Sequence, residues 1–362
     1  MDGSVSSELK DQKRRKRSAK PAARLAKSAG QRRTTSSARK RTGSKKAVSK
    51  KRVRTRAKQP QTKQRLDALQ EKILRAIETR NPEEILQVLR IDTEEPQELS
   101  YDHRNFAYRE LLQHFRTPTQ KEILWQMTRY CAARPELVAR QLACAVLDVF
   151  WKDRQPEAER LLLNLARDED WEVREYAAAT MARIVRKNFR ANSPYIRRWA
   201  ENPDPSIRRQ VLIAVVAISD GGRSDWAEAL LQVVASNLRD RDPYIRRNLG
   251  PYALGEGLLR HYPDETLEAM RNWARHKDEM VRWNVGMGLT SPWVKGHWEE
   301  ALQILKSIGA DKRRNVWQAV SAALQNLLRL HPEEVEPRMQ EWMRERGLRV
   351  AVSTALAASQ KS

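Results

Sequence analysis

Apolar residues recur at helical spacing along most of the chain. From Arg65 onward, Leu66, Leu69, Ile73 and Ile77 fall on one helical face. The same spacing predicts helices over 82–90, 101–116, 119–132 and 135–152, and paired helices from 156 to about 346. Breaks are expected at Pro118, Pro156, Pro194, Gly221-Gly222, Pro263, Pro292 and Pro332, and an acidic loop over 91–100. Period-two alternation is absent, so the pattern predicts an all-α body of about seven or eight helix pairs.

One short pattern, D-x-x-[V/I]-R, repeats within this body. It begins at Asp170, Asp204, Asp242 and Asp278, with separations of 34, 38 and 36 residues. Each Asp is expected to cap a helix, and the Val or Ile three residues later to enter the core. The arginine that follows is expected to reach the Asp or a carbonyl of the neighbouring repeat. A helical unit with this period predicts a repeat solenoid over residues 65–362.

The residue after that arginine is a candidate for binding. In register these residues are Glu175, Arg209, Arg247 and Trp283. Stacked repeats would align them along one face, where a carboxylate, two guanidiniums and an indole could meet a polyanion. The alternative is that they are solvated residues or ladder contacts between repeats.

Positive charge is concentrated at the N-terminus. Residues 1–60 hold 22 Lys and Arg against Asp2, Glu8 and Asp11, and the other 302 residues hold 47 bases and 43 acids. Residues 1–64 lack aromatic residues, and such a low-complexity segment is expected to be disordered. Nucleic-acid phosphate is the expected partner; a nuclear-import signal or an anionic membrane surface are alternatives. The expected phosphate contacts are Lys13, Arg14, Arg15, Lys16, Arg17, Lys50, Lys51, Arg52, Arg54 and Arg56.

Other residue types exclude several classes of chemistry. Cys131 and Cys144 form no C-x-x-C pair and are expected to be buried thiols. No nucleotide-binding, zinc-protease or serine-hydrolase motif occurs, so neither metal nor cofactor is expected. No apolar stretch reaches 18 residues, which favours a soluble intracellular protein without a membrane partner. Most of the eleven tryptophans, all of them in the body, are expected to fill the core.

Several segments carry a resemblance to a known family. E-L-V-A-R-Q-L-A-C-A-V-L-D-V-F (136–150), D-W-E-V-R-E (170–175), W-A-E-N-P-D-P-S-I-R-R (199–209) and Y-I-R-R-N-L-G (244–250) resemble the HEAT-like-repeat DNA alkylation repair glycosylases. The likeness covers about residues 100–290 and implies a HEAT-like α-solenoid that holds duplex DNA in its concave groove. It also implies removal of cationic bases such as 7-methylguanine and 3-methyladenine.

The resemblance assigns roles to particular residues. It implies that Trp171 and the carboxylate of Glu175 act beside the deoxyribose, that Arg209 holds the DNA backbone, and that Arg247 is a basic position of the next repeat. A carboxylate can stabilise an oxocarbenium-like sugar while the cationic base departs. Two positions differ from the family: Glu175 stands where one branch has Asp, and Pro251, followed by Tyr252, stands at the second tryptophan. Tyr252 and Trp283 are added as candidate DNA contacts.

Two main functions follow from these observations. The first is a monomeric, nucleoid-associated DNA glycosylase in the cytoplasm, or in the nucleus of a eukaryote. The second is a non-catalytic HEAT-repeat scaffold that is tethered to DNA by its tail and binds a protein partner in its groove. The first predicts that Trp171, Glu175, Arg209 and Arg247 converge in one basic concave groove. The second predicts that Glu175 is engaged in a salt bridge or faces the convex side, and that the groove is acidic or apolar. An RNA-associated solenoid is a third alternative.

Overall fold

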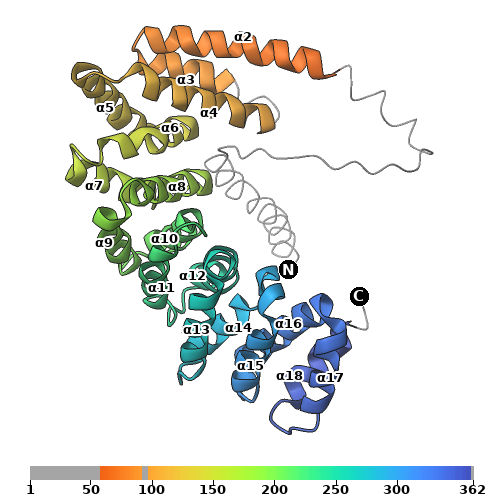
Figure 1. Cartoon of the computed structure of the whole chain (residues 1–362). Helices are drawn as coiled ribbons and strands as arrows, with labels where there is room; N and C mark the ends of the chain where they lie inside the picture. Colours follow the sequence, from red (N-terminus) through yellow and green to blue (C-terminus); the bar gives the residue numbers. More distant parts are fainter. Residues whose placement is uncertain (1–57, 92–96, 360–362) are drawn as a thin grey trace, which may run out of the picture. The chain divides into compact units, whose positions relative to one another are not determined.

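A computed structural model describes residues 58–91 and 97–359, and in these ranges every regular element is a helix (Figure 1). The described part contains 17 α-helices, which confirms the predicted all-α class. Contacts between residues divide the chain into two compact units, Met1–Val146 and Leu147–Ser362. The prediction of one continuous array over 65–362 stays a prediction.

Unit 1 is built from five described helices: α2 (Lys58–Glu78), α3 (Pro82–Ile91), α4 (Gln97–His114), α5 (Pro118–Ala132) and α6 (Leu137–Leu147). Helix α2 packs against α3 and α4, and α3 contacts α5. Pro118 starts α5, as predicted, and Thr117 caps it in a capping box with Gln120. Two boundaries were wrong: α2 begins inside the segment expected to be disordered, and α4 begins within the expected 91–100 loop.

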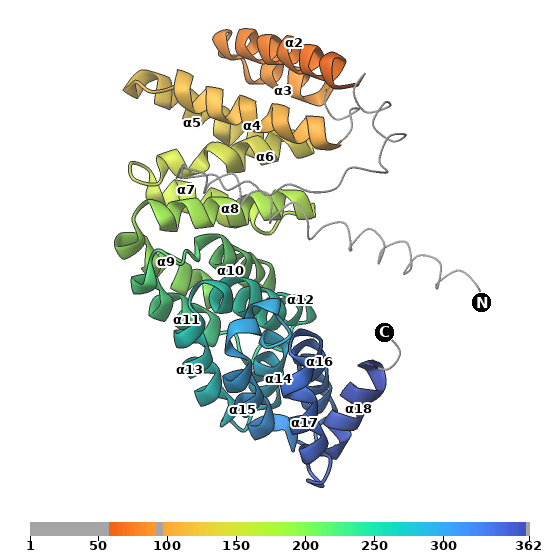
Figure 2. The same cartoon turned by 45° about the vertical axis from the view of Figure 1, so that its right-hand side comes forward.

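Unit 2 consists of helix pairs arranged in two rows (Figures 1 and 2). The outer row contains α7 (Gln155–Leu165), α9 (Phe189–Ala200), α11 (Ala227–Ala235), α13 (Pro263–Ala274), α15 (Trp298–Gly309) and α17 (Pro332–Trp342). The inner row, on the inside of the bend of unit 2, contains α8 (Trp171–Lys187), α10 (Pro205–Ile218), α12 (Pro243–Asn248) with η4 (Leu249–Leu259), α14 (Glu279–Gly288), α16 (Arg314–Leu330) and α18 (Arg349–Ser359). Consecutive inner helices pack directly on one another, with η4 filling the position between α10 and α14.

The aspartate and the Val or Ile of the repeated motif have the predicted roles, whereas the arginine differs from its prediction. Asp170, Asp204, Asp242 and Asp278 are the N-caps of α8, α10, α12 and α14, and each carboxylate accepts a backbone N–H of the first turn. The Val or Ile of each repeat is buried. The motif arginines mostly bond carbonyls of their own repeat rather than the neighbour's; Arg208, for example, donates to the backbone oxygens of Asn202 and Pro203.

A second recurring contact was not predicted. In five of the six inner helices, the residue two positions before the N-cap accepts the N-cap's own backbone N–H, which fixes the entry of the chain into the helix. The acceptors are Asp168, Asn202, Asp240, His276 and Asp311. Because five different repeats share this bond, the inner helices begin in equivalent positions.

Element η4 is a π-helix in the middle of the inner row. Pro251 near its start has no N–H, and a proline ring clashes with the carbonyl four residues earlier in an α-helix, so the wider turn accommodates it. Gly250 is required by packing, since a Cβ there would lie 2.6 Å from the Cβ of Met287. The break at Pro194 was wrong, because this proline lies inside α9.

Fewer tryptophans are buried in the core than the sequence predicts. Only five of the eleven are buried, namely Trp125, Trp151, Trp199, Trp226 and Trp342. Trp293 is 41% exposed, and the others are half-buried. Both cysteines are buried, as predicted.

Candidate functional site

Two of the residues that the resemblance singled out, Glu175 and Arg209, form an ion pair between two inner helices. Glu175 on α8 accepts a hydrogen bond from Nη2 of Arg209 on α10 at 2.8 Å. The two side chains are only 10% and 12% exposed. The pair is therefore a contact between neighbouring repeats, which was the alternative considered for these positions.

Tyr244 of the following repeat covers this pair. The guanidinium of Arg209 lies 4.6 Å from the centre of the Tyr244 ring, in a cation–π arrangement. The Tyr244 hydroxyl in turn accepts a hydrogen bond of 2.9 Å from Nη2 of Arg174 on α8. Repeats of a solenoid ordinarily contact only their neighbours. The Arg174–Tyr244 bond passes over α10 to join α8 directly to α12, so Arg209 is enclosed between the two.

Polar side chains surround the Glu175–Arg209 pair, and one of them, Gln210, has an amide nitrogen without a hydrogen-bond partner. Burial raises the pKa of Tyr252 to about 12; the negative charge of Glu175 adds to the rise and Arg209 opposes it. Tyr252 thus lies within electrostatic reach of the pair. Gln210 is fully buried, and its Oε1 accepts from Arg209 while its Nε2 lacks a hydrogen-bond partner. These four side chains, with Tyr244 and Arg174, are called the inner cluster below.

Three other predicted site residues, Trp171, Arg247 and Trp283, lie outside the inner cluster. Trp171 is the half-buried first residue of α8, one turn before Glu175 and on the same helical face. Arg247 is exposed and forms no ion pair with another described residue, so it does not join the inner cluster. Trp283 on α14 is half-buried and is stacked by Arg246 at 4.5 Å, not by a residue of the inner cluster.

The basic clusters at 13–17 and 50–56 lie outside the described residues. Among residues 58–91 and 97–359, no group of three His, Cys, Asp or Glu side chains is placed to hold a metal ion. Over the same ranges, none of the helices combines the length and the apolar character needed to cross a membrane.

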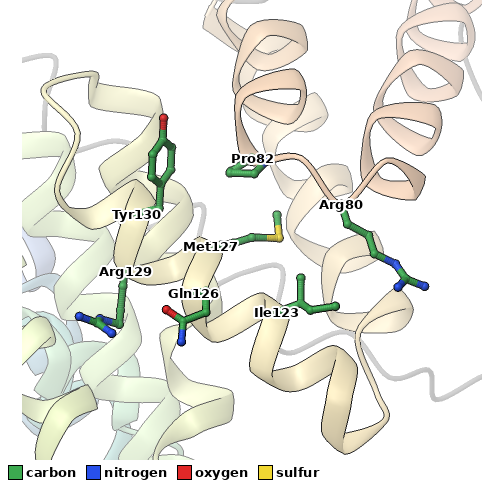
Figure 3. A pocket seen from close by; sticks show the side chains of 7 residues that line it. All are labelled: Arg80, Pro82, Ile123, Gln126, Met127, Arg129 and Tyr130. Carbon is green, nitrogen blue, oxygen red and sulfur yellow. The ribbon is translucent and has the colours of Figure 1, made fainter.

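Unit 1 contains a shallow pocket of about 580 Å³ beside the α2–α3 turn (Figure 3). Its lining residues are Arg80, Pro82, Ile123, Gln126, Met127, Arg129 and Tyr130. None of the predicted site residues lies in it, and it contains no paired acid and base for catalysis.

Sequence reasoning missed Tyr244 and Arg174 as parts of the site. From the sequence, Arg174 is expected only to reach the motif Asp or a carbonyl of the neighbouring repeat, and Tyr244 is only part of a repeat segment. A usable signal was present, since an aromatic residue at position 244 replaces Ser206 of the preceding repeat. The contact to Arg174, two repeats away, depends on how tightly the inner row bends, and no local pattern encodes that.

The comparison with protein families supports the repeat architecture, because residues 158–250 match the model for HEAT repeats. No curated protein matches the sequence. Among solved structures, a chain from a study of Kap95p binding to RanGDP is 13% identical with a TM-score of 0.39; the match covers 76% of this chain but only 42% of that one. A designed armadillo repeat protein in complex with the peptide (KR)4 is 16% identical with a TM-score of 0.28, over 56% of this chain and 98% of that one. The family match over residues 158–250 supports the HEAT-repeat part of the resemblance, and the DNA-repair part stays a prediction. The chain is an all-α solenoid with HEAT repeats in its central part.

Proposed function

We propose that this protein is a non-catalytic HEAT-repeat scaffold. The basic N-terminal segment tethers it to DNA, and the inner row of unit 2 binds a partner. The observation that supports this proposal most directly is the ion pair between Glu175 and Arg209. A carboxylate that stabilises an oxocarbenium-like sugar must face that sugar and a water molecule. The Glu175 carboxylate instead faces the guanidinium of Arg209 in a nearly buried position.

The Tyr244 ring, which lies over Arg209, further limits access to the Glu175–Arg209 pair. A DNA phosphate could compete for Arg209 only after the Tyr244 ring moved aside, and Tyr244 is held by Arg174. Separating a buried ion pair leaves an uncompensated charge, which is strongly unfavourable. Arg209 is thus engaged within the protein, and a strand of DNA would have to displace two sets of contacts to reach it.

A DNA glycosylase for cationic alkylated bases is the second candidate. It is favoured by one observation, the proximity of Glu175, Arg209 and Tyr252 on the inner row, with Trp171 one turn away. In this alternative Tyr252 would take part of the role of the second tryptophan, and substrate would have to open the inner cluster.

Release of 7-methylguanine from duplex DNA separates the two candidates. The full chain, in excess over the duplex, is compared with Glu175→Gln and with a sample without protein, because this base is also lost spontaneously. We expect release at the spontaneous rate in all three samples. Faster release by the natural chain that Glu175→Gln abolishes would establish the glycosylase and end the scaffold proposal.

A further inference from the structure

The charge at the start of the inner helices changes along unit 2. We compare equivalent windows that run from three residues before the N-cap to five after it. The first window, 167–175, holds five acids and two bases, and the second, 201–209, holds two of each. The next three windows, 239–247, 275–283 and 310–318, hold ten bases and five acids together. The positive end begins two repeats beyond Glu175, in the repeat that contributes Tyr244 to the inner cluster.

Six exposed cations dominate the positive end. None of them forms an ion pair with another residue in the described part of unit 2. They are Arg241, Arg247, Arg275, Lys277, Lys312 and Arg314, and we call them the cationic edge.

The five acids of these windows have partners other than the six cations, and bases outnumber acids by two to one. Asp240 pairs with Arg208, and Asp311 pairs with Arg282 and Arg313. Asp242 and Asp278 accept the backbone N–H groups of the helices that they cap, and Glu279 accepts a hydrogen bond from Asn315.

The three windows form one continuous surface. Arg239 bonds His276 of the next window at 2.8 Å, and Nη1 of Arg313 donates to the Lys277 carbonyl at 2.8 Å. Asn315 donates to Glu279 at 2.7 Å. Figure 2 shows the corresponding helices, α12, α14 and α16, following one another along the inner row. The six cations therefore lie on a single edge of three joined repeats.

We propose that the cationic edge binds a short acidic segment of a partner protein. Guanidinium groups pair with carboxylates through two parallel hydrogen bonds, and four of the six cations are arginines. The inference rests on the proposed scaffold function and names the chemistry of the partner.

The charge of the rest of unit 2 favours an acidic peptide over a nucleic acid. A long, uniformly charged strand that followed the edge would reach the five acids of the first window. A segment that spans only three repeats does not reach those acids.

The test measures binding of a fluorescein-labelled peptide of twelve glutamates by fluorescence anisotropy. The full chain is first saturated with a 20-base-pair duplex, so that the basic N-terminal segment is occupied. The variant Arg241→Glu/Lys277→Glu/Lys312→Glu alters the edge, and Lys13→Glu/Arg14→Glu/Arg15→Glu is the control with the same charge change. Loss of three exposed charge pairs should weaken peptide binding by about tenfold or more in the edge variant. The control should bind the peptide within about twofold of the natural chain.

The inference is overturned when the edge variant binds the peptide as tightly as the natural chain. If that variant also loses duplex affinity, the edge is assigned to nucleic acid instead. The substituted side chains are exposed, so the melting temperature should be preserved; should it fall, the glutamine triple at the same positions is used, with a smaller expected loss. Base release in the 7-methylguanine assay would instead contradict the scaffold function itself.

Discussion

Deletion of residues 1–57 is expected to remove most of the affinity for duplex DNA and most of its salt dependence. These residues contain 21 Lys and Arg and three acids. Each phosphate neutralised by a basic residue releases counterions, so six to ten such contacts cost roughly a thousandfold or more in affinity between 50 and 200 mM salt. We expect the full chain to show that loss and the truncated chain to lose about tenfold or less.

The deletion ends where α2 begins, at Lys58, so the described helices are retained. Affinities are measured by anisotropy at four salt concentrations, and circular dichroism verifies that helix content is preserved. A truncated chain with the same salt slope as the full chain would show that DNA is bound by the body and not by the N-terminal segment.

The second large effect is expected on stability. Arg209→Ala should lower the free energy of unfolding by about 3 kcal/mol, because it leaves the Glu175 carboxylate buried without its partner. Arg247→Ala is the matched control, since Arg247 occupies the same repeat position but is exposed and unpaired. A surface substitution of this kind typically changes stability by less than about 0.5 kcal/mol.

Urea unfolding followed by circular dichroism compares the two variants. Equal midpoints for Arg209→Ala and Arg247→Ala would mean that the ion pair is not closed in solution. In that case Glu175 would be available to a ligand, and the argument against catalysis would lose its basis.

The sequence predicted the repeats because their signals are local. The helix caps at Asp170, Asp204, Asp242 and Asp278 depend on a few residues around each helix start, and all four were confirmed. Burial of the Val or Ile in each motif follows from helical periodicity in the same way.

The predictions that failed depend on packing between distant residues. The sequence predicts a helix break at Pro194, yet α9 continues through this proline to Ala200. Trp283 was placed beside Glu175 and Arg209 by register alone, whereas Arg246 stacks on it within the inner row. The cover that Tyr244 provides requires α8 and α12 to approach across α10, which only the assembled inner row determines.

A double-mutant cycle on Glu175 and Arg209 tests the central claim most directly. The free energies of unfolding are measured for the natural chain, Glu175→Ala, Arg209→Ala and the double variant. A closed, nearly buried pair predicts that the double variant is more stable than the sum of the single effects, with a coupling energy of roughly 2 kcal/mol. Effects that add to within about 0.5 kcal/mol would contradict the account, because the carboxylate would then be free to act on a bound substrate.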